Sequence, residues 1–214
     1  MIRILEHKDW VIFSLLGIGF LYVFVLRVLL RDINLVEFFT LKKEVANNTF
    51  QAWLLVSLGF AIAVGLALSS LLPMVPHWFA TEISVWGYQP NKIGSVLLSL
   101  LVLFAFRNFF TYFLFASIGD LDRWASFYFV ATKFFMGSTL ALIALILAQY
   151  YLSIDTEWML YAYMAFFSIS FIFKNLVYYF HKDEILPEEW YYKILYICTL
   201  QILPFLVVWK FLFL

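Results

Sequence analysis

The chain has 214 residues, of which 65% are apolar, 22% are aromatic and only 13% are charged, and its formal net charge at pH 7 is zero. A soluble domain averages about 45 to 50% apolar and about 25% charged residues. So few charges cannot cover a water-exposed surface, which excludes a soluble enzyme, a nucleic-acid-binding protein and a disordered chain. The composition therefore predicts an integral membrane protein that lies in the lipid bilayer.

Six stretches are long and apolar enough to cross a membrane as helices, because a bilayer core about 30 Å thick requires about 20 mostly apolar residues. They are residues 10–30, 52–72, 93–117, 127–151, 158–180 and 192–214. The first stretch is longer than the apolar part of a signal peptide and has no small-residue cleavage site, so it is expected to stay attached. The sequence thus predicts an all-α fold, a single domain over 1–214 that forms a bundle of six transmembrane helices.

The basic residues in the connections, the terminal segments and the ends of the spans indicate the orientation, since lysine and arginine favour the cytosolic side. Six lie in or beside the first, third and fifth connections: Arg31, Lys42, Lys43, Arg123, Lys182 and Lys193. Four lie on the opposite face: Arg3, Lys8, Lys92 and Lys210. An even number of spans places both termini on one side, so both termini are predicted outside the cytosol.

The first connection contains a short helix signal. Asn34 with Glu37 three residues later is typical of a helix start, and apolar residues and lysines follow. This pattern predicts a short helix lying on the cytosolic face of the membrane.

An internal repeat relates the third and fifth spans. The pattern Phe-x-Phe-[Arg/Lys]-Asn-x-x-x-Tyr-Phe begins at Phe104 and again at Phe171, an offset of 67 residues. Trp124 before the fourth span matches Trp190 before the sixth. The chain is therefore interpreted as three repeated helical hairpins, with chance similarity of aromatic-rich helices as the alternative.

Charges inside the predicted spans are all positive. The 14 acidic residues fall outside the spans, whereas five basic residues lie inside them, Arg27, Arg107, Lys133, Lys174 and Lys210, and Lys193 lies at the start of the sixth. A charged group in hydrocarbon costs about 2.5 to 3.5 kcal/mol on insertion scales and usually pairs or faces a polar cavity. With no carboxylate in the spans, the expected partner is an anion.

Depth separates these cations. Arg27 and Lys210 lie near span ends and can extend to the interface, and Lys133 and Lys174 can nearly do so, whereas Arg107 lies ten residues from its span end. Asparagines and tyrosines lie beside Arg107 and Lys174, and a guanidinium group offers two parallel hydrogen bonds to phosphate. The candidate residues for binding an anionic lipid head group are Arg27, Arg107, Asn108, Tyr112, Lys133, Lys174, Asn175 and Tyr179. Alternatively, Arg107 bonds helix carbonyl groups or reaches Asp120 or Asp122 through water.

Two further patterns bear on partners and chemistry. Small residues recur at four-residue spacing in the second span, at Gly59, Ala63 and Ala67, which indicates a packing seam inside the bundle or a homodimer face. The three histidines stand at no metal-binding spacing, and no phosphate-binding glycine loop or nucleophile motif occurs, so no metal, cofactor or catalytic residue is predicted.

The repeated Phe-Arg-Asn and Phe-Lys-Asn helices and the tight turn at 119–124 resemble a family of small polytopic membrane proteins of Bacteroidetes, a domain of unknown function. The resemblance covers nearly the full chain and implies a bacterial inner membrane, with the termini then on the periplasmic side. It implies no catalytic residues.

Three functions compete on this sequence. The first is a non-enzymatic membrane protein that binds or handles an anionic lipid or lipid-linked substrate in the cytosolic leaflet. The second is an accessory or scaffold subunit of an envelope membrane complex, docked through the small-residue seams. The third, a membrane enzyme of lipid metabolism, would use acidic clusters in the cytosolic connections, where paired carboxylates can hold Mg²⁺.

Overall fold

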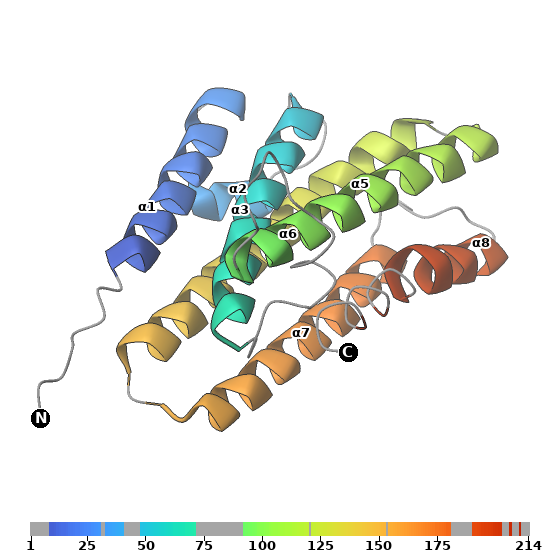
Figure 1. Cartoon of the computed structure of the whole chain (residues 1–214). Helices are drawn as coiled ribbons and strands as arrows, with labels where there is room; N and C mark the ends of the chain where they lie inside the picture. Colours follow the sequence, from blue (N-terminus) through green and yellow to red (C-terminus); the bar gives the residue numbers. More distant parts are fainter. Residues whose placement is uncertain are drawn as a thin grey trace, which may run out of the picture.

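The structure, a computed structural model, describes residues 9–30, 33–40, 48–71, 92–119, 121–152, 154–180 and 190–202, with Leu206 and Lys210. Over these residues the secondary structure is helical, without strands (Figure 1). The α-helices are α1 (Asp9–Phe24), α2 (Leu35–Thr40), α3 (Thr49–Leu71), α5 (Lys92–Ile118), α6 (Leu121–Tyr151), α7 (Thr156–Phe180) and α8 (Trp190–Leu195). Two π-helical segments, η1 (Val25–Leu29) and η3 (Tyr196–Ile202), continue α1 and α8.

Five of the described segments are long and apolar enough to cross a membrane. They are Trp10–Leu29, Thr49–Ser69, Ile93–Ile118, Arg123–Tyr151 and Glu157–Tyr179. These segments match the first five predicted spans to within a few residues. Residues 203–205, 207–209 and 211–214 of the sixth predicted span, 192–214, lie outside the described residues, so that span stays a prediction.

The long helices run back and forth, so their ends meet at two ends of the bundle (Figure 1). At one end, Phe50 at the start of α3 stacks on Trp124 of α6 with 5.9 Å between ring centroids, and Tyr112 of α5 meets Trp124 edge-on at 5.6 Å. Gly119 joins α5 to α6 here with a φ of +82°, a backbone conformation that glycine adopts without strain. We call this the turn-119 end. At the other end, Trp10 of α1 packs edge-on against Tyr150 of α6 at 6.1 Å.

Helix α3 is the central element, packed against α1, α5 and α6. Its small side chains permit this close packing: Ala63 is 0% exposed, and a Cβ atom at Gly59 would lie only 2.7 Å from the ring of Tyr22 in α1. A Cβ atom at Gly65 would lie 3.3 Å from Leu97 in α5. The interpretation of this seam as a dimer face is therefore wrong, because side chains of the same chain occupy it.

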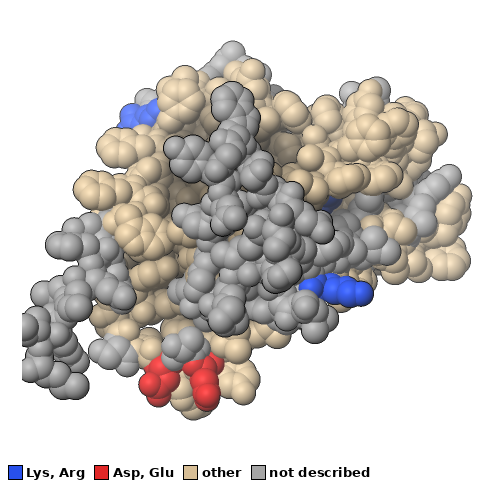
Figure 2. Space-filling model, viewed as in Figure 1, with Lys and Arg blue, Asp and Glu red and all other residues tan. Residues whose placement is uncertain are grey.

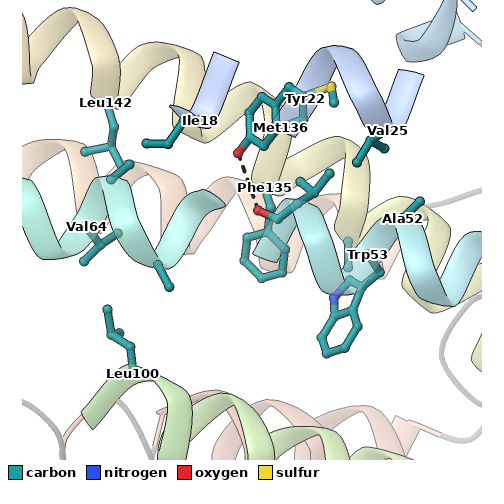
Figure 3. Close-up of a cluster of buried hydrophobic side chains, with 14 of the residues drawn as sticks. Ile18, Tyr22, Val25, Ala52, Trp53, Val64, Leu100, Phe135, Met136 and Leu142 are labelled. Atoms are coloured by element: carbon teal, nitrogen blue, oxygen red, sulfur yellow. Dashed lines mark hydrogen bonds between the residues drawn. The ribbon is translucent and has the colours of Figure 1, made fainter. Parts of the chain in front are cut away.

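A polar contact links the helices within the apolar core (Figure 3). The Tyr22 hydroxyl of α1 donates a hydrogen bond of 2.6 Å to Oγ1 of Thr139 in α6, whose own hydroxyl donates to the carbonyl oxygen of Phe135 at 2.7 Å. Apolar side chains surround the pair, including Ile18 and Met136. The buried hydroxyl groups are thus paired, as a dry core requires.

Helix α2 confirms the short helix expected in the first connection, and it packs on α6. Phe38 of α2 is 0% exposed and meets Phe129 of α6 edge-on, with 6.2 Å between ring centroids. The neighbouring Phe39 ring lies 3.5 Å from the point where Gly137 of α6 would carry a Cβ atom. One face of α2 is therefore part of the bundle.

The outward faces of the helices are apolar. Phe20 of α1, Phe106 of α5 and Ile169 of α7 are each more than half exposed. Uncharged residues dominate the face shown in Figure 2, and the acidic residues visible there gather at the connection between α6 and α7, where Asp155 and Glu157 lie. A surface of this kind is expected where helices contact lipid.

Candidate anion-binding site

Arg107 of α5 faces phenol groups from other helices. Its guanidinium interacts with the hydroxyl groups of Tyr178 in α7 and Tyr196 in η3. Tyr128 of α6 also lies within electrostatic range of Arg107. Tyr128, Tyr178 and Tyr196 are exposed by only 1%, 2% and 0%. The deepest predicted cation is thus held at a junction of four helical segments.

Lys174 of α7 lies beside Arg107 and is itself buried, with 6% of its side chain exposed. Its ammonium lies 5.3 Å from the ring centroid of Phe135, 5.7 Å from that of Tyr178 and 5.8 Å from that of Phe134. Aromatic faces attract a desolvated cation by about 2 kcal/mol. We call the set Arg107, Lys174, Tyr128, Tyr178 and Tyr196 the cationic cluster.

Packing of aromatic rings fixes the cationic cluster. The Phe127 ring of α6 lies 5.0 Å from that of Tyr178 and 5.7 Å from that of Tyr196, between centroids. Lys174 and Tyr178 are four residues apart on α7 and therefore share a helix face. The rings hold the hydroxyl groups toward Arg107 at little cost in side-chain entropy, since a tyrosine has only two rotatable bonds.

Several buried polar atoms of α5, α6 and α7, the helices that carry most of the cationic cluster, have no hydrogen-bond partner. They are Asn108 Oδ1, Thr111 Oγ1, Trp124 Nε1, Tyr128 Oη, Asn175 Oδ1 and Tyr178 Oη. Tyr178 Oη faces Arg107, but the two groups do not meet the distance and angle limits of a hydrogen bond. Each buried polar atom without a partner costs about 1 to 3 kcal/mol. Two cations among such atoms form a site that can bind a polar, anionic group.

The structure brings together some of the predicted residues. Arg107 and Lys174 meet, and the asparagine that follows each of them is partly buried. Tyr112 and Tyr179 are 46% and 54% exposed; Tyr112 packs against Trp124 at the turn-119 end, and the ring centroid of Tyr179 lies 5.4 Å from the ammonium of Lys193. The two tyrosines therefore lie outside the cationic cluster.

Arg27 and Lys133 lie elsewhere. Arg27 is in η1, which packs against α3, and its side chain is exposed. The Lys133 ammonium of α6 donates a 3.0 Å hydrogen bond to the carbonyl oxygen of Phe39 and lies 4.7 Å from the ring centroid of Phe129. Because Phe39 is in the last turn of α2, Lys133 satisfies a carbonyl that the short helix leaves unpaired.

Replacing Lys133 with methionine is expected to loosen α2 and leave anion binding unchanged. Loss of one hydrogen bond to a charged group should speed amide exchange over Leu35–Thr40 about tenfold. Hydrogen exchange followed by mass spectrometry measures this rate, with Lys193→Met as the control cation. Unchanged exchange over α2 together with weakened lipid retention would contradict this assignment.

Sequence reasoning missed the hydroxyl groups that complete the site. Thr111 and Tyr178 stand at matched positions of the internal repeat, four residues after Arg107 and Lys174, and both are buried. The sequence therefore shows a hydroxyl-bearing residue one helical turn after each cation, and both could have been predicted as site residues. Tyr128 and Tyr196 belong to other segments, and no pattern in the sequence connects them with Arg107.

Exposure is similar at matched positions of α5 and α7. Phe106 and Phe173 are 59% and 58% exposed, and Tyr112 and Tyr179 are also both exposed. The two motifs thus present cations inward and aromatic rings outward in the same way. The interpretation of the whole chain as three repeated hairpins stays a prediction.

The apolar helices and the buried cationic cluster define the chain as a multi-pass helical membrane protein of unknown activity. The chain belongs to the family described as Domain of unknown function (DUF4271), whose model matches residues 10–212. This match confirms the expected resemblance to an uncharacterised family. No curated protein and no solved structure matches the chain. The cationic cluster is therefore the basis for proposing a function.

Proposed function

We propose that the chain is a six-span protein of a bacterial inner membrane, with periplasmic termini, that binds the phosphate of an anionic lipid or lipid-linked substrate through Arg107 and Lys174. The turn-119 end lies in the cytosol in this proposal, so the ligand comes from the cytosolic leaflet. The protein presents or moves this ligand and does not modify it chemically.

The surroundings of Arg107 carry this proposal. In the part of the chain that the structure describes, the groups that face its guanidinium are phenols and the Lys174 ammonium, and none is a carboxylate. A guanidinium placed in hydrocarbon needs a compensating anion or strong acceptors. A phosphate supplies both, because two of its oxygens accept the parallel hydrogen bonds of the guanidinium fork.

The depth of the cluster suits a lipid phosphate. Arg107 lies eleven residues before the end of α5, about 16 Å along the helix. Its guanidinium interacts with the hydroxyl of Tyr178, which lies only two residues before the end of α7, about 3 Å along that helix. The Arg107 guanidinium therefore lies closer to the turn-119 end than the Cα atom of Arg107 does. A lipid head group that enters a short distance below the membrane surface reaches this depth.

The two alternative functions have less support. The seam around Gly59 packs inside the chain, so it is not free to dock a partner. The acidic residues that an enzyme would use lie outside the described residues, apart from Asp122, whose side chain is not described. No observation in the described part of the chain favours either alternative over lipid binding.

Native mass spectrometry of the gently extracted protein tests the proposal. The wild type is expected to retain an anionic phospholipid, and the folded Arg107→Leu, Lys174→Leu double variant is expected to lose it. Arg27→Leu removes an exposed cation outside the cluster and should retain the lipid. Equal lipid retention by the wild type and the double variant would show that the buried cations are purely structural.

A further inference from the structure

We infer that the head group bound by the cationic cluster carries hydroxyl groups beside its phosphate, as a glycerol or sugar phosphodiester does. This inference rests on the proposed function and names the ligand class more closely. It is carried by buried polar atoms on α5 and α7, one residue or one helical turn after the two cations, which a phosphate alone does not satisfy.

The amide of Asn175 requires a hydrogen-bond donor. Its Nδ2 donates to the carbonyl oxygen of Phe171 at 2.9 Å, which fixes the orientation of the amide. The remaining Oδ1 is buried without a partner and can only accept. An ionised phosphate diester also only accepts, so the group that satisfies Asn175 must be a donor on another part of the ligand. Asn108, directly after Arg107, likewise has a buried Oδ1 without a partner.

Two buried hydroxyl groups extend the pattern. Thr111 and Tyr178 lie one helical turn after Arg107 and Lys174 and are 1% and 2% exposed; the Thr111 hydroxyl has no hydrogen-bond partner, and the Tyr178 hydroxyl faces Arg107. A hydroxyl both donates and accepts, so each can bind a phosphate oxygen or a hydroxyl of the ligand. Helices α5 and α7 thus each offer a cation, an amide oxygen and a hydroxyl.

The donor on the ligand is expected to be neutral. An ammonium head group would also donate to the amide oxygens, but it would lie next to Arg107 and Lys174. Like charges repel strongly where the dielectric constant is low. Hydroxyl groups supply donors without this repulsion, which favours a polyol over an amine or a bare phosphate.

The test compares two lipids that differ only in hydroxyl groups. Phosphatidylglycerol and phosphatidylpropanol with the same acyl chains carry the same phosphodiester and the same single charge. In nanodiscs, the wild type is expected to bind phosphatidylglycerol about tenfold more tightly. Asn175→Leu keeps the side-chain volume and removes the acceptor, so it should bind both lipids equally and weakly. Asn108→Leu, on a different helix, repeats the test if the first variant does not fold.

The outcomes separate this inference from the proposed function. Equal affinity of the wild type for both lipids would overturn the inference, because water would then be able to donate the hydrogen bonds that the amide oxygens accept. The proposal of lipid binding itself would stand. Undiminished binding of both lipids by a folded Arg107→Leu variant would overturn the proposed function. Glycerol 1-phosphate, added as a competitor, tells whether the natural ligand is a lipid or a soluble molecule. If it displaces the lipid at a concentration similar to that of the lipid, the site is assigned to a soluble polyol phosphate. If it does not displace the lipid, the site is assigned to a lipid.

Discussion

Replacing Arg107 by leucine is expected to weaken binding of an anionic phospholipid by about 10- to 100-fold. The leucine removes a charged donor to phosphate, and hydrogen bonds to charged groups contribute about 1.5 to 3 kcal/mol. It also leaves the hydroxyl groups of Tyr178 and Tyr196 facing an apolar side chain. Lipid titration followed by native mass spectrometry gives the affinity.

Arg107→Lys is the matched variant for this prediction. It keeps the positive charge but replaces the planar fork with a single ammonium, so its affinity should fall between those of the wild type and the leucine variant. If Arg107→Lys binds as weakly as Arg107→Leu while both remain folded, the charge itself contributes nothing. If all three proteins bind equally, Arg107 does not contact the ligand.

Substituting Gly59 by alanine is expected to destabilise the bundle by about 1 to 3 kcal/mol, the usual cost of overpacking a core. The new methyl group would lie 2.7 Å from the Tyr22 ring. That ring cannot move away cheaply, because its hydroxyl is hydrogen-bonded to Thr139 at 2.6 Å. The free energy of unfolding in mixed micelles measures the loss.

Gly17 and Gly19 provide the controls for this substitution. Both lie in α1, and a Cβ atom at either position would meet no other atom within 4 Å. Alanine there is expected to leave the stability unchanged or slightly raised, since alanine favours helix over glycine. A loss at Gly59 no larger than at Gly17 would mean that α1 and α3 do not pack as closely as the structure shows.

The sequence predicted those features that depend on residues close together in the chain. Five apolar spans follow from composition and length, and the cations at Arg107 and Lys174 follow from their place within those spans. Their mutual approach was expected as well, because the predicted orientation places both cations in the cytosolic half of the membrane.

The sequence could not predict features that depend on distant segments. Lys133 was read as a head-group contact, but its partner is a carbonyl oxygen 94 residues away in α2. Tyr196 reaches Arg107 only because η3 returns alongside α5. The seam at Gly59 was interpreted as a packing seam with a dimer face as the alternative, and the position of Tyr22 in the folded chain shows that Gly59 packs internally.

A double-mutant cycle on lipid affinity tests most directly whether Arg107 and Lys174 bind one anion together. The affinities of the wild type, Arg107→Leu, Lys174→Leu and the double variant are measured under identical conditions. Residues that hold the same phosphate are coupled, so the double variant should bind little more weakly than the weaker single variant. Losses that simply multiply, or no loss in either single variant, would contradict a shared anion-binding site.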